Sequence, residues 1–176
     1  MHRTVLPILC FLLTYATPAA AQKRAAPAAA TPKWALDVSA KPLPTGDLSG
    51  RIYNRPFRLG RAEIDKQGLL LRMGKDFFPD SAVRIFLFKK GIPQNCEVTV
   101  PFSGEFGVSN PHIHLHYREN LASDDLPKVK IFSNAYSMRL VLGAARDGYV
   151  PGAIYLTMTD TSRSYLAGMF LAKVVP

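Results

Sequence analysis

The sequence predicts an all-β fold, with an antiparallel β-sandwich of about 8–10 strands as the main expectation and a closed β-barrel as the alternative. From residue 47 onward, short apolar runs alternate with breaks rich in Gly, Pro, Asn and Asp. Short runs at regular spacing with turn residues between them are typical of sandwiches and barrels. No part of this region carries an apolar stripe at i, i+3, i+4 and i+7 between helix caps, so we expect no helix.

Ten apolar runs are the candidate strands. Asn54 and Pro56, residues that favour a turn, separate the first two. The run at 82–88 is apolar on both faces, which is typical of a central strand, and 165–175 has the same character. In chain order the runs cover 48–53, 57–64, 69–73, 82–88, 96–100, 112–117, 129–132, 136–142, 154–158 and 165–175.

Two of the later runs indicate which side chains point inward. Side chains of a strand alternate between its two faces, so residues two apart share a face. The inward faces of 136–142 and 154–158 are expected to carry Tyr136, Met138, Leu140, Leu142, Ile154, Leu156 and Met158.

Residues 1–21 have the features of a cleaved signal peptide. Arg3 supplies a positive start, 5–15 form an apolar run, and 16–21 end in the small-x-small pattern that signal peptidase accepts. The run is shorter than the roughly 20 residues that span a bilayer, and no later run is apolar enough. We therefore expect cleavage near Ala21 and export to the periplasm or secretion, with no transmembrane segment in the mature chain.

Residues 22–46 are expected to form a flexible linker before a single domain at 47–176. The segment is rich in Ala, Pro and Lys, and its prolines prevent a continuous helix. Trp34, which is the only tryptophan of the chain, and Leu36 lie within it and could dock on the domain as a short strand.

Only one cysteine remains after cleavage, because Cys10 lies in the signal segment. Cys96 shares a strand face with Val98 and Val100, which predicts a buried and unreactive thiol. The mature chain is therefore not expected to form an internal disulfide, and a reactive or intermolecular thiol is the alternative.

The chain is basic, with 22 Lys and Arg against 13 Asp and Glu and a net charge of +9, which becomes +8 when Arg3 leaves with the signal segment. The basic residues are dispersed, so a solvated basic surface is the simplest interpretation. For an exported protein the available anions are lipid headgroups, acidic polysaccharide and cell-wall polymers. An anionic or glycan component of the cell envelope is the expected class of partner, and nucleic acid is not expected.

Three histidines occupy alternate positions of the run 112–117 (HIHLHY). Ile113, Leu115 and Tyr117 alternate with them and should face the core, which leaves His112, His114 and His116 on solvent or a groove. Neighbouring imidazoles lie about 6.6 Å apart along a strand, so two can bind one ion, whereas the outer pair at about 13 Å cannot. A Zn or Cu site completed by downstream carboxylates is the hypothesis, and a polar, titratable strand face is the alternative.

The turn between the predicted strands 69–73 and 82–88 contains two adjacent aromatic residues. One ring could cap the core while carboxylates accept hydrogen bonds from turn amides. The alternative is a ligand-binding loop, because an exposed ring beside polar groups suits the apolar face and hydroxyl rim of a sugar. The candidate ligand-binding residues are Lys75, Asp76, Phe77, Phe78 and Asp80, and further aromatics that could contribute are Tyr53, Tyr149 and Tyr155.

Known catalytic motifs are absent from the sequence, including Gly-x-Ser-x-Gly, Ser-x-x-Lys, a phosphate loop and His-Glu-x-x-His. A non-enzymatic binding or interaction domain is therefore the main expectation, with a carbohydrate or cell-envelope polymer as the candidate ligand. The alternative is a periplasmic Zn- or Cu-binding protein that uses the histidine strand. A hydrolytic enzyme or a structural assembly protein is the third hypothesis.

Overall fold

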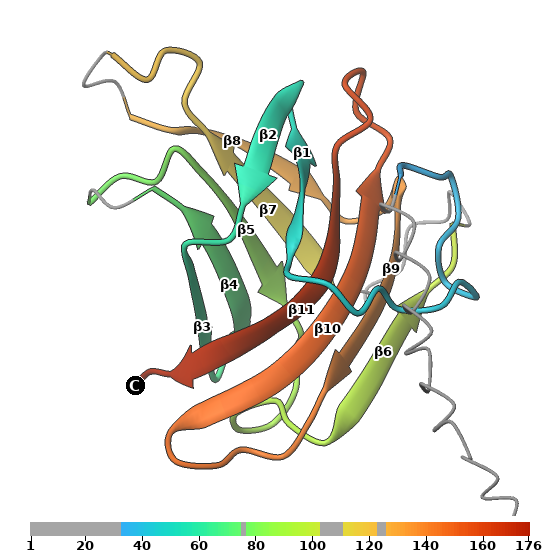
Figure 1. Cartoon of the computed structure of the whole chain (residues 1–176), viewed down its shortest axis with the longest axis vertical. Coiled ribbons are helices and arrows are strands. Elements are labelled where there is room, and N and C mark those ends of the chain that lie inside the picture. The colour runs from blue at the N-terminus through green and yellow to red at the C-terminus, as the bar shows by residue number, and fades with distance from the viewer. Residues whose placement is uncertain (1–32, 75–76, 103–110, 123–125) are drawn as a thin grey trace, which may run out of the picture.

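The computed structural model describes residues 33–74, 77–102, 111–122 and 126–176. The all-β prediction is confirmed, since these residues contain eleven strands and no helix (Figure 1). None of the described segments therefore forms a helix that could cross a membrane. The strands are β1 (Ser49–Ile52), β2 (Arg55–Arg58), β3 (Arg61–Asp65), β4 (Gly68–Met73), β5 (Ser81–Phe86), β6 (Cys96–Val100), β7 (His112–Tyr117), β8 (Lys128–Phe132), β9 (Tyr136–Leu142), β10 (Tyr149–Met158) and β11 (Tyr165–Val174).

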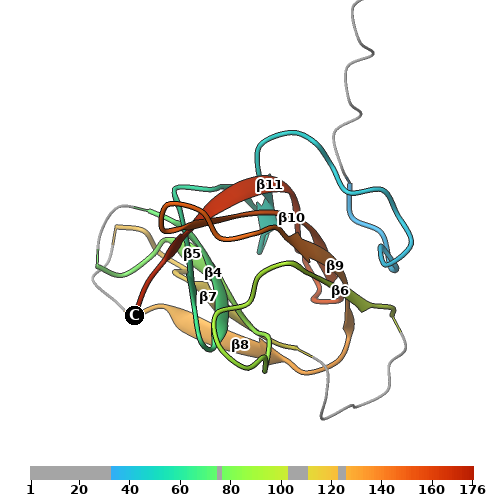
Figure 2. The ribbon, with the colours of Figure 1, turned by 90° about the horizontal axis from the view of Figure 1, so that it is seen from below.

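The described strands form one mixed sheet with the order β6-β9-β10-β11-β3-β4-β5-β7-β8. Every pairing along this order is antiparallel except the parallel contact between β11 and β3. Two perpendicular views show that the sheet curls into an open half-barrel (Figure 1, Figure 2). Neither the predicted two-sheet sandwich nor the closed barrel is confirmed, because the described strands make a single open sheet.

The β1–β2 hairpin branches from this sheet, because β11 pairs with two different strands along its length. Its first residues pair with β1, and its last residues pair with β3. Two glycines permit the close approach at the branch: a Cβ on Gly50 would lie 2.0 Å from the carbonyl oxygen of Tyr165. A Cβ on Gly168, where φ is 140°, would lie 2.6 Å from the carbonyl oxygen of Asp47. A larger residue at either position would therefore separate β1 from β11.

Apolar side chains fill the concave side of the half-barrel. The inward faces predicted for β9 and β10 are confirmed, because all seven of those side chains are buried. Ile113 and Leu115 of β7 are each 0% exposed and belong to the same core. Cys96, the only cysteine among the described residues, is a free thiol that packs against this core but is half-buried, so the predicted full burial is wrong. Full burial of each large apolar side chain contributes about 1.5–3 kcal/mol.

Two differences from the predicted runs go beyond one or two residues at a strand end. The run 57–64 is divided between β2 and β3, because the chain leaves β1 and joins β4 at Leu59 and Gly60. β10 begins at Tyr149, well before the predicted run 154–158, and includes Pro151. Pairing between β9 and β10 ends at Gly152, one residue after Pro151. The Pro151 carbonyl oxygen accepts the Gly143 N–H of the β9–β10 turn at 2.8 Å, and proline is tolerated because no strand residue needs an N–H from it.

Residues 33–46 pack along the outer face of β9, β10 and β11, and we call them the N-terminal strap (blue in Figure 1). Trp34 docks as the sequence allowed, without forming a strand, and donates its indole N–H to a β10 carbonyl at 2.8 Å. Val38 is 0% exposed, and its N–H donates to the Ser137 Oγ at 2.9 Å. This half of the predicted linker is therefore held against the sheet, while residues 22–32 lie outside the described residues.

Candidate functional site

The rim of the half-barrel carries a pocket of about 320 Å³, which we call the rim pocket. It lies where the β1–β2 turn and the β10–β11 turn meet the end of β7, and both turns are at the upper end of Figure 1. The residues that line it are Ile52, Tyr53, Asn54, Arg55, Ser81, Tyr117, Arg118, Glu119 and Ser162.

Two stacked tyrosines form the aromatic wall of the rim pocket. The rings of Tyr53 and Tyr117 have centroids 3.9 Å apart and an interplanar angle of 23°. Tyr53 and Asn54 are the central residues of the β1–β2 turn, with φ of 46° and 63°, as a type I′ turn requires. Bulky residues rarely adopt positive φ, so the turn holds Tyr53 against Tyr117 at a conformational cost. Burial, followed by the contact with Tyr117, raises the pKa of Tyr53, and its phenol stays neutral at physiological pH.

A buried polar network fixes the backbone behind Tyr53. The Tyr53 N–H donates to the Ser164 Oγ at 3.0 Å, and this hydroxyl donates to the Asp160 carboxylate at 2.9 Å. Asp160 also accepts the N–H groups of Ser164 at 2.8 Å and of Ser162 at 3.3 Å. A buried donor that loses its partner costs about 1–3 kcal/mol. The network therefore holds the β10–β11 turn against the β1–β2 hairpin.

Guanidinium groups line the side of the rim pocket formed by the end of β7. Arg55 donates from Nη1 to the Arg118 carbonyl oxygen at 2.9 Å and from Nη2 to the Glu119 carbonyl oxygen. The Nε of Arg118 is buried and has no hydrogen-bond partner among the described residues. The Glu119 carboxylate pairs with the Nζ of Lys128 at 2.7 Å. The pocket therefore combines aromatic rings, cations, an amide and hydroxyls, with Glu119 as the one carboxylate among its lining residues.

The end of the predicted ligand-binding loop between β4 and β5, at Asp80, lies beside the rim pocket. The Asp80 carbonyl oxygen accepts the Arg118 N–H at 3.1 Å, and the next residue, Ser81, lines the pocket. Phe77 is 87% exposed and Phe78 is 38% exposed, with the two rings edge to face at 5.0 Å. Neither ring belongs to the buried core or to the lining of the rim pocket, so the loop presents an exposed aromatic pair of its own. The other predicted residues of this loop, Lys75 and Asp76, lie outside the described residues.

The sequence pattern indicated Tyr53 but gave no signal for most of the rim pocket. Tyr117 packs on the core side of β7, as the alternation predicts, but its place at the strand end brings it to the rim. Arg118 and Ser162 belong to turns of two other hairpins, and nothing in the local sequence links them. Tyr149 lies at the opposite end of β10, and Tyr155 is buried beneath the strap, so neither joins the pocket.

The three histidines of β7 point away from the core, as predicted. Ile113 and Leu115 are fully buried, whereas His112, His114 and His116 are half-buried on the outer face. Phenylalanine rings pack on two of the imidazoles, with centroid distances of 4.6 Å at His114 and 5.0 Å at His112. Burial, and after it the neighbouring imidazole, lowers the pKa of both His114 and His116, so these side chains are neutral near pH 7.

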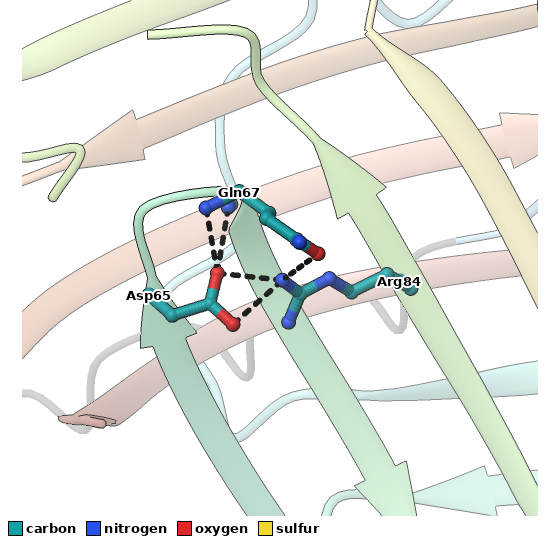
Figure 3. Close-up of polar contacts among 4 residues, drawn as sticks. Asp65, Gln67 and Arg84 are labelled. Carbon is teal, nitrogen blue, oxygen red and sulfur yellow. Dashed lines mark hydrogen bonds and ion pairs between the residues drawn. The ribbon is translucent and has the colours of Figure 1, made fainter. Parts of the chain in front are cut away.

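Arg84 of β5 lies opposite His114 in the sheet and is already paired. One guanidinium nitrogen contacts both carboxylate oxygens of Asp65, at 2.5 and 2.7 Å, and Gln67 Oε1 at 3.3 Å (Figure 3). Asp65 also accepts the N–H groups of Gln67 at 2.7 Å and Gly68 at 3.1 Å. Partial burial raises the pKa of Asp65, but these donors outweigh it and hold the pKa below its usual value. Asp65 is thus engaged by Arg84 and the turn amides.

No group of three His, Cys, Asp or Glu side chains within the described ranges is arranged to hold a metal ion. The acidic residues closest in sequence to the end of the histidine strand include Asp124 and Asp125, which lie outside those ranges. A Zn or Cu site built on two of the three histidines therefore stays a prediction.

Comparison with known proteins finds no family model, no curated protein and no solved structure that matches the chain. The functional interpretation therefore depends on the geometry of the rim pocket and of the surfaces around it.

Proposed function

We propose that the protein is an exported, non-enzymatic binding domain that holds a carbohydrate or a related cell-envelope polymer in the rim pocket. The observation that carries this proposal is the stacked pair Tyr53 and Tyr117, which forms one wall of a pocket whose other lining residues, apart from Ile52, are polar. A pyranose ring has an apolar face and a rim of hydroxyls, so it fits an aromatic surface beside hydrogen-bond donors and acceptors.

The polar side chains around the tyrosine pair have the chemistry that sugar hydroxyls require. Asn54 and Ser162 offer an amide and a hydroxyl, and they are joined to each other by a hydrogen bond of 3.3 Å. Arg118 adds a cation with several N–H donors, which suits a carboxylate or phosphate on an acidic envelope polymer. The loop that ends at Asp80, beside the pocket, also carries the exposed ring of Phe77.

The carboxylate content of the rim pocket favours binding over glycoside hydrolysis. Hydrolysis of a glycosidic bond generally uses two carboxyl groups about 5–9.5 Å apart. Glu119 is the one carboxylate among the described lining residues, and it is paired with Lys128. An oligosaccharide bound here would meet no second carboxylate from those residues.

A binding panel tests the proposal directly. Peptidoglycan fragments, neutral cello-oligosaccharides and oligogalacturonates are titrated into the mature protein by calorimetry. We expect at least one class to bind and Tyr117→Ala to weaken that binding about tenfold, since a lost aromatic platform costs about 1 kcal/mol or more. Tyr149→Ala is the matched control, because this exposed tyrosine lies at the opposite end of β10. Absence of binding across the panel, or equal loss in both variants, contradicts the proposal.

Export is tested by the mass of the protein recovered from outside the cytoplasm. Cleavage after Ala21 predicts a mature chain that begins at Gln22. Retention of the full-length chain inside the cell would contradict the exported location.

A further inference from the structure

A second pocket, of about 310 Å³, lies where the N-terminal strap meets the β10–β11 turn, and it shares no lining residue with the rim pocket. We call it the strap pocket. Its lining residues are Lys33, Trp34, Arg51, Arg163 and Tyr165. Three of these five side chains are cationic, and none is acidic.

Trp34 holds one of the three cations in place. Its indole N–H donates to the Met158 carbonyl oxygen at 2.8 Å, which fixes the ring on β10. The guanidinium carbon of Arg163 lies 5.1 Å from the Trp34 ring centre, in a cation–π contact. The residue before Trp34 is also held, because the Tyr155 hydroxyl donates to the Lys33 carbonyl oxygen.

Arg51 is the most constrained of the three cations. It lies directly opposite Tyr165 in the β1–β11 pairing, so both side chains point to the outer face. Its Nη2 donates to the Ser162 carbonyl oxygen at 3.3 Å, and its Nε is buried without a hydrogen-bond partner among the described residues. The stem of this side chain is packed, so its charged end is positioned before any ligand arrives.

The positive charges of the strap pocket are not neutralised by nearby acids of the described chain. None of Lys33, Arg51 and Arg163 forms an ion pair within those ranges. Asp160, in the same turn as Arg163, is buried and uses its carboxylate oxygens on Ser162 and Ser164. Like charges that line one small pocket repel each other, and a bound anion relieves that repulsion.

We propose that the strap pocket is an oxyanion-binding site, which holds a phosphate, sulfate or carboxylate group between Lys33, Arg51 and Arg163. Guanidinium groups that no carboxylate neutralises bind oxyanions through charge-assisted N–H···O hydrogen bonds. The Lys33 ammonium completes the site from the strap, so the site exists only while the strap is docked. This proposal goes beyond the proposed function, because the strap pocket would bind an anion whether or not the rim pocket binds a sugar.

The single tryptophan of the chain makes the test direct, because Trp34 lines the pocket. Inorganic phosphate, inorganic sulfate and an oligogalacturonate are titrated into the full mature chain, with Trp34 fluorescence and calorimetry as independent readouts. We expect a saturable change with at least one probe. Saturation by free phosphate or sulfate identifies a site for a small oxyanion, and saturation by the oligogalacturonate alone identifies a site for acidic groups of a polymer.

Matched charge variants distinguish a specific binding site from nonspecific attraction to the positive charge of the protein. Lys33→Gln with Arg163→Gln removes two exposed cations of the pocket and is expected to weaken binding about tenfold. Lys66→Gln with Arg146→Gln removes the same two charges from exposed turns elsewhere and should leave affinity within about twofold. No saturable signal with any probe, or equal weakening in the two double variants, overturns the proposal.

Discussion

Replacement of Ser137 by alanine should release the N-terminal strap from the sheet. The Ser137 side chain is 0% exposed and lies under the strap on β9. Its Oγ accepts the Val38 N–H at 2.9 Å and lies 2.9 Å from Asp37 Oδ1 and 3.1 Å from the Val100 carbonyl oxygen. The hydroxyl thus joins the strap to β9 and to the end of β6, and alanine removes all of these contacts while preserving the strand.

The expected loss follows from the burial of Val38, which is 0% exposed. A buried N–H without a partner costs about 1–3 kcal/mol, and the Asp37 contact adds little because that carboxylate is exposed. We therefore expect a loss of about 2 kcal/mol in the free energy that keeps the strap docked. If opening of the strap is coupled to unfolding of the whole domain, this lowers Tm by about 4–8 °C.

Two measurements on Trp34 check this prediction. Its emission should shift to longer wavelength, and exchange of its indole proton should accelerate about 30-fold, the factor that corresponds to about 2 kcal/mol. Thr99→Ala is the control, because this exposed hydroxyl on β6 has one long hydrogen bond of 3.5 Å to Glu97. Unchanged emission, exchange and Tm in the Ser137 variant would refute the view that this hydroxyl holds the strap.

The remaining predictions concern the histidine face. The pKa of His114 and His116 is lowered by burial from the usual 6.5, so the unfolded state takes up protons first as the pH falls. The contribution of these two residues to the free energy of unfolding is therefore complete above about pH 6.5 and is lost as the pH drops through the lowered pKa values. Replacement of both, by His114→Gln with His116→Gln, should flatten the acid side of a Tm–pH profile. A profile of unchanged slope would contradict this. For the metal hypothesis, titration of untagged protein with Zn²⁺ or Cu²⁺ should show one bound ion, and His114→Ala should abolish it because His114 belongs to both candidate neighbouring pairs. An untagged wild-type protein that binds neither ion would remove that hypothesis, and single substitutions of His112 or His116 identify the pair if binding occurs.

The strands, and the face of the sheet to which each side chain points, could be predicted from the sequence, because period-two alternation is a local property. Ile113 and Leu115 are buried and the histidines that alternate with them face outward, as the pattern HIHLHY predicts. The inward row on β9 followed from the same alternation. The division of 57–64 between two strands could not be predicted, because it depends on a change of pairing partner from Leu48 at Leu59 to Arg72 at Gly60, which side-chain alternation does not specify.

The two pockets depend on contacts that local sequence does not encode. Tyr53 reaches Tyr117 because the sheet curls, and the Trp34 indole N–H meets a carbonyl 124 residues later in the chain. Alternation specifies which face a side chain takes, but not which strand lies beside it or how far the sheet bends. The sequence by itself therefore determined an all-β chain with an inner and an outer set of side chains. The tertiary structure alone decided the open half-barrel, the docked strap and both pockets, since these arise from long-range pairing and close approach at glycines such as Gly168.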